Sequence, residues 1–98
     1  MSTTARKTYE SAITSAGSTK LASLDAANQT RVAAYHTALA AFNAGGSYAT
    51  YAAAIVAADK AYLAAVDAAE AAREQSVASA AATLVASDAV GPSGFGLN

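Results

Sequence analysis

The stretch Asn43-Ala44-Gly45-Gly46-Ser47 decides the fold of this 98-residue chain. A glycine pair ends a helix because glycine readily adopts the left-handed conformation found after a helix C-terminus, and Ser47 suits the N-cap of a following helix. The stretch separates two runs of helix-compatible residues, 3–44 and 47–88. Because a tight turn between arms of equal length lays them side by side, the sequence predicts an all-α fold, an antiparallel helical hairpin.

Two further glycine-containing segments interrupt the helical pattern. Gly17 costs about 1 kcal/mol inside a helix, so the first arm can break or kink there. The segment Gly91-Pro92-Ser93-Gly94-Phe95-Gly96 ends the second arm, because proline and closely spaced glycines do not continue a helix. The predicted organisation is therefore a hairpin over residues 1–90, followed by an extended tail over residues 91–98.

The larger apolar residues follow a helical period in both arms, which supports the hairpin. In the first arm they are Leu21, Leu24, Val32, Tyr35, Leu39 and Phe42, and in the second Tyr48, Tyr51, Ile55, Tyr62, Val66, Val77 and Leu84. We expect these two stripes to face each other. Several members of the second stripe are eleven residues apart, a period that favours nearly straight packing. The opposite faces carry mainly Ala and Thr, small residues that let another helix approach closely, so we expect an oligomeric bundle or larger assembly.

Charged residues predict the register of the two arms. Folding the chain about Gly45-Gly46 pairs positions whose numbers sum to about 91, which places Lys20 near Glu70 and Arg31 near Asp59. The same register sets Asn28 opposite Tyr62. Exposed ion pairs contribute only about 0–1 kcal/mol each, so we expect them to select the register more than to stabilise it.

Composition indicates a weak core and excludes most chemistry. Alanine accounts for 31 residues, and only 17 positions carry Val, Ile, Leu, Met or Phe. A lone fold built on alanine contacts gains little from burial, so we expect the chain to need partners. The absence of cysteine and the single histidine, His36, exclude disulfides, thiol catalysis and multi-histidine metal sites. We expect no enzyme activity, no cofactor, no metal and no small-molecule substrate.

Charge and hydropathy exclude two further classes of partner. The net charge is −1 and charged residues make up 13% of the chain, so we expect no nucleic-acid binding. Residues 32–58 carry no charge, but His36 and Gly45-Gly46 interrupt them, and we expect no membrane span. The N-terminus lacks the apolar run of a secretory signal, which favours a virion or cytoplasmic location.

Five residues are the candidate partner contacts. Phe95, Leu97 and Val90 belong to or adjoin a tail that has no internal means of folding, and Phe95 is the expected anchor. Tyr48 and Phe42 flank the uncharged turn. The expected partners are further copies of the chain, larger structural proteins, or both.

The spacing of Thr8, Thr19 and Thr30 resembles the repeat of the alanine-rich helical antifreeze proteins, because the three threonines are eleven residues apart in an Ala-rich helix. The resemblance implies an ice-binding Thr/Ala face. It covers about 30 residues, since Ala41 stands at the next repeat position and the second arm does not repeat the pattern.

The layout of about 100 residues in two helices with a central glycine-containing turn is similar to the WXG100 secreted proteins. The turn here, residues 42–47, has no Trp, and no Tyr has an acidic residue four positions later. A secreted helical hairpin is therefore an alternative that rests on the layout alone.

The function predicted from the sequence is that of a non-enzymatic structural protein, a small helical subunit of a larger complex. An accessory protein of a bacteriophage head, neck or tail is the expected setting. The secreted hairpin and the ice-binding helix are the alternatives.

Overall fold

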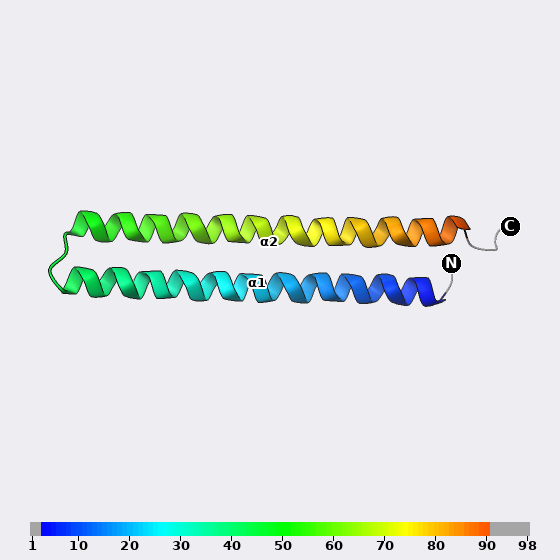
Figure 1. Ribbon diagram of the computed structural model, residues 1–98, viewed down its shortest axis with the longest axis horizontal. Coiled ribbons are helices and arrows are strands. Elements are labelled where there is room, and N and C mark those ends of the chain that lie inside the picture. The colour runs from blue at the N-terminus through cyan, green and yellow to red at the C-terminus, as the bar shows by residue number, and fades with distance from the viewer. Residues whose placement is uncertain (1–2, 91–98) are drawn as a thin grey trace. The chain divides into compact units, whose positions relative to one another are not determined.

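The computed structural model describes residues 3–90, with side chains up to residue 87. Helix α1 spans Thr3–Asn43, helix α2 spans Tyr48–Val90, and a short turn joins them (Figure 1). The prediction of an all-α helical hairpin is confirmed. The predicted tail over residues 91–98, with Phe95 and Leu97, lies outside the described residues.

The chain packs as two units, which are described separately. The turn unit consists of residues 21–69 and contains the end of α1, the turn and the beginning of α2. The terminal unit combines residues up to Lys20 with residues from Glu70 onward. In each unit a segment of α1 packs against a segment of α2.

Hydrogen bonds at the turn pair carbonyl groups at the end of α1 and an N–H group at the start of α2. The Gly46 N–H donates to the Ala41 carbonyl and the Gly45 N–H to the Phe42 carbonyl, each at 3.0 Å, which is the Schellman arrangement. Gly45 has a φ of 108°, a conformation that favours glycine. On the other side, Ser47 Oγ accepts a 3.1 Å hydrogen bond from the Thr50 N–H and so caps α2.

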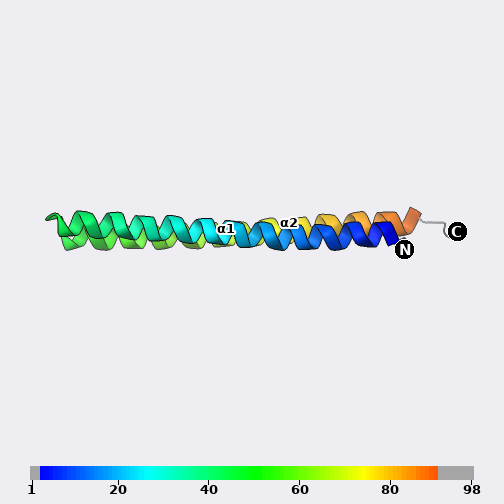
Figure 2. The same ribbon diagram turned by 90° about the horizontal axis from the view of Figure 1, so that it is seen from below.

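The sequence leaves open whether the first arm breaks near Gly17, and α1 runs through this residue without interruption (Figures 1 and 2). A Cβ built on Gly17 would meet nothing within 4 Å. One glycine costs only about 1 kcal/mol in a helix, and the packing of the flanking turns outweighs that cost.

Gly17→Ala should therefore stabilise the protein. Alanine removes the excess backbone freedom of glycine in the unfolded chain and fits the open space, so we expect the free energy of unfolding to rise by about 0.5–1 kcal/mol. Thermal melting followed by circular dichroism at fixed protein concentration measures the change. A lower melting temperature would show that residue 17 needs glycine and that the helix is irregular there.

The core consists of alanine. Ala16, Ala38 and Ala69 are the buried apolar residues of the described chain, and no large side chain in that range is fully buried. Ala16 and Ala38, which we expected on the outward face of α1, are thus buried against α2. The expected α1 stripe is only partly the seam, because Leu24 and Tyr35 are half-buried. Leu21, Val32 and Leu39 stay exposed. The physical reason is that alanines admit a closer approach of two helices than leucines do.

Helix α2 uses most of its expected stripe. Tyr51, Ile55, Tyr62, Val66, Val77 and Leu84 are all half-buried, while Ala53, Ala57, Ala64, Ala68, Ala71 and Ala82 are exposed. An eleven-residue spacing also appears in α1, where Ala5, Ala16, Ala27 and Ala38 are buried or half-buried. Small residues of α1 and larger residues of α2 therefore recur along the seam with the same period.

Candidate interaction surface

Two of the predicted partner contacts form an aromatic cluster beside the turn. The Phe42 ring centroid lies 6.3 Å from that of Tyr48 and 5.4 Å from that of Tyr51. Tyr48 and Tyr51 are 6.1 Å apart. Tyr48 exposes 69% of its surface. Rings at these distances contact one another favourably, and Phe42 and Tyr48 are also exposed to solvent. Val90 ends α2, but its side chain lies outside the described set.

Seven large apolar side chains of the turn unit are exposed, with exposed fractions between 38% and 69%. We call them the apolar face. Its members are Leu21, Val32, Leu39 and Phe42 on α1 and Tyr48, Val56 and Leu63 on α2.

Helix geometry places both halves of the apolar face on one side of the helix pair. Leu39 follows the buried Ala38 by one residue, which turns it about 100° from the seam. Leu63 precedes the buried Ala69 by six residues, which turns it about 120° in the same sense. In an antiparallel pair the same sense of rotation reaches the same broad side on both helices. The hydrogen bond from Tyr35 to Asp59 crosses the seam on this side and agrees with the assignment.

The opposite side of the turn unit is a groove lined mainly by small residues. One part, of about 560 Å³, is lined mostly by small residues such as Thr37, Ala41 and Thr50, and also by Phe42 and Tyr51 of the aromatic cluster. A second part, of about 180 Å³, includes Thr30 and Ala61 in its lining. The turn unit thus has a Leu/Val-rich side and an Ala/Thr-rich side.

Hydroxyl groups of the threonines bond back to their own helix. Thr8, Thr30 and Thr37 donate to the carbonyl four residues earlier, each at 3.0 Å. Their hydroxyl donors are therefore satisfied inside α1. Thr8, Thr19 and Thr30, the spaced threonines of the sequence, are all exposed. An ice-binding role for them stays a prediction.

Polar contacts across the seam of the turn unit differ from the expected ones. Asp59 accepts a hydrogen bond from Tyr35 instead of pairing with Arg31. The Arg31 guanidinium lies over the Tyr62 ring at 3.8 Å and donates to Asn28 Oδ1 at 2.9 Å, so Arg31 links Asn28 to Tyr62. The bond to Asp59 is the main cause that raises the pKa of Tyr35 above 10.0.

The terminal unit contains the ion pair that the register predicted. Lys20 Nζ donates to a carboxylate oxygen of Glu70, and the expected pairing is confirmed. Arg73 approaches the other oxygen of Glu70 at 3.6 Å. The hydrogen bond from Lys20, followed by the charge of Lys20, lowers the pKa of Glu70 below its usual 4.5.

Acid should weaken the contact between Lys20 and Glu70. Because the folded state lowers the pKa of Glu70, the stability that it contributes is complete above pH 4.5 and is lost as the pH falls through the folded pKa. Urea unfolding of the native chain and of Glu70→Gln, at several pH values from 7 to 2, measures the contribution of the Glu70 carboxylate to the free energy of unfolding. We expect the native chain to be the more stable at pH 7 and the difference to shrink in acid. A difference independent of pH would contradict an ionic contribution.

A second groove, of about 820 Å³, lies in the terminal unit. Its lining includes Tyr9 and Leu84 together with hydroxyl-bearing residues such as Thr8, Ser79 and Thr83. It is an open and largely small-residue surface like the groove of the turn unit.

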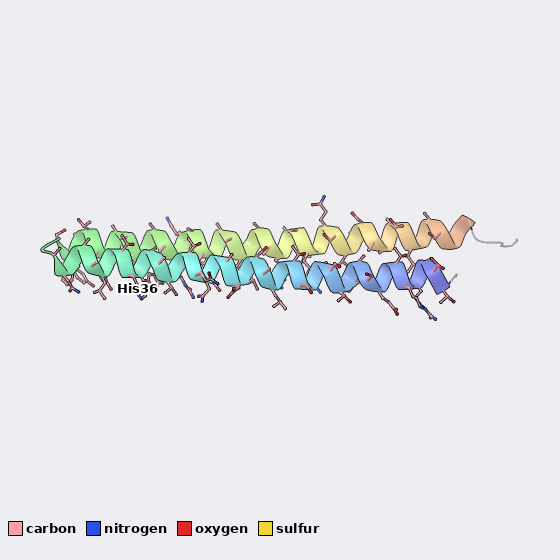
Figure 3. All side chains as sticks on the ribbon, turned by 60° about the horizontal axis from the view of Figure 1, so that its bottom comes forward. His36 is labelled. Atoms are coloured by element: carbon pink, nitrogen blue, oxygen red, sulfur yellow. The ribbon has the colours of Figure 1, made fainter. Side chains whose placement is uncertain are left out.

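His36 is exposed and points away from α2 (Figure 3). No group of three or more His, Cys, Asp or Glu side chains within residues 3–87 is placed to hold a metal ion. Neither described helix has a stretch long and apolar enough to cross a membrane.

Sequence reasoning missed Val56 and Leu63 as surface residues. They lie outside the predicted α2 stripe, yet their spacing of seven residues puts them on one helix face. The same spacing separates Val32 and Leu39 in α1. Two equal spacings of exposed large apolar residues are the signal that could have revealed this face.

Comparison of the chain with protein-family models, curated proteins and solved structures finds no match.

Proposed function

We propose that this chain is a non-enzymatic assembly protein that works by packing its apolar face against other protein helices. The observation that carries the proposal is that small apolar residues are buried while large ones are exposed. The fully buried apolar residues of the described chain are alanines, while Leu21, Leu63 and five other large apolar residues of the turn unit are exposed on one side. Large apolar side chains exposed together on one side of a protein indicate an interaction site.

The aromatic cluster beside the turn extends the same surface. Phe42 and Tyr48 are the predicted partner contacts that fall within it. Tyrosine and phenylalanine supply large contact areas at low entropic cost, and such residues dominate binding energy at interfaces. The bacteriophage head, neck or tail setting stays a prediction.

Site-specific photo-crosslinking in cells that make the protein tests the proposal. A photo-reactive phenylalanine analogue is placed at Leu63 on the apolar face or at Ala64, its exposed neighbour on the other side of α2. We expect discrete protein adducts from position 63 and few from position 64. Equal adducts, or none at position 63, would exclude the apolar face as the working surface.

A further inference from the structure

We infer that the occupant of the apolar face is a second copy of this chain, so that two turn units stack face to face as a four-helix bundle. This inference rests on the proposed function and names its partner. The seven side chains of the face, at their exposed fractions, present roughly 700 Å² of surface, close to the roughly 800 Å² that each partner gives to a standard interface.

Two acidic groups share the side of the apolar face. The rotation that places Leu39 and Leu63 on this side also places Asp25 and Asp59 there. Each carboxylate already accepts a hydrogen bond within its own chain, Asp25 from Gln29 and Asp59 from Tyr35, so a second copy needs no basic group to neutralise them. Asp59 is the acidic group nearest the seam on this side, and it accepts the Tyr35 hydroxyl. Charged residues of both signs, including Asp25 and Lys60, are exposed in the same unit and can form a polar rim.

The composition of the core explains why two copies would gain free energy by stacking. The described chain fully buries only Ala16, Ala38 and Ala69 among its apolar residues, and a single copy leaves the seven side chains of the apolar face in water. Stacking two helix pairs would place Leu21, Leu39 and Leu63 in a shared core, which is how four-helix bundles bury such residues. A two-fold arrangement uses the same patch on both copies and closes without forming a filament.

Sedimentation equilibrium of the full chain over a concentration series, with two matched variants, tests the inference. We expect a mass of twice the 9.6 kDa chain at about 100 µM, well above the dissociation constants typical of such an interface. Leu63→Glu should raise the dissociation constant at least about 30-fold, because each copy then brings an unpaired charge into the interface. Ala64→Glu, one residue away and off the face, should change it by less than about threefold.

A second measurement decides the matter if Leu63→Glu fails to fold. The chain contains no cysteine, so Leu63→Cys and Ala64→Cys each introduce a single thiol. At high protein concentration a maleimide reagent should modify the thiol at position 63 at least about tenfold more slowly than that at position 64, since a second copy covers it. Dilution should remove the difference.

The outcomes separate this inference from the proposed function. A folded monomer at about 100 µM, a dimer that Leu63→Glu leaves intact, or equal thiol reactivity would each overturn the second copy as partner. Position-specific photo-adducts to another protein, combined with a folded monomer, would retain the proposed function and reject the inference. A folded monomer without such adducts would reject both.

Discussion

Ala69→Leu is expected to lower the free energy of unfolding by about 1–3 kcal/mol. Ala69 exposes only 7% of its surface and lies at the seam where the helices of the turn unit meet. Leucine adds three carbon atoms that the closely packed alanine interface cannot admit without moving a helix or straining a rotamer. The loss would correspond to a decrease of several degrees in melting temperature for a protein of this size.

Ala68→Leu is the matched control, because Ala68 is the exposed neighbour on the same helix. It should change the free energy of unfolding by no more than about 0.5 kcal/mol. Urea denaturation of both variants at one fixed protein concentration provides the comparison, since association would otherwise alter the apparent stability. Equal effects of the two substitutions would show that the helices do not meet at position 69.

Gly45→Ala is expected to cost about 1–2 kcal/mol, because residue 45 has a φ of 108° and an L-amino acid is strained there. Gly46→Ala should also destabilise, for a different reason. A Cβ at residue 46 would lie 2.9 Å from the Ala41 carbonyl oxygen, the acceptor of the hydrogen bond from the Gly46 N–H. Both substitutions disturb the Schellman arrangement that closes α1.

Gly17→Ala is the control for a glycine replacement as such, and its effect should have the opposite sign. Thermal melting of the three variants measures the contrast. If all three replacements stabilise the chain, the turn does not have the backbone conformation described here. Gly45→Asn should be less harmful than Gly45→Ala, because asparagine tolerates positive φ better than other residues with a side chain.

The hairpin itself was predictable because its signals are local. Gly45 and Gly46 stop α1, Ser47 caps α2, and the hydrogen bonds at the turn involve residues within a few positions of one another. The Lys20–Glu70 contact was predictable for a related reason, since a short turn and a regular rise per residue set the register of distant positions.

The sequence by itself therefore determined the helices, the turn and the approximate register of this protein, whereas only the tertiary structure decided which face of α1 meets α2. Sequence periodicity favoured Leu21, Val32 and Leu39 as the seam, since large apolar residues are usually buried. The residues of α1 that are buried instead are Ala16 and Ala38, and α2 contributes the buried Ala69 together with half-buried larger residues. Closeness of approach depends on the side chains of both helices at once, so small residues on α1 accommodate larger ones on α2 and the leucines remain at the surface.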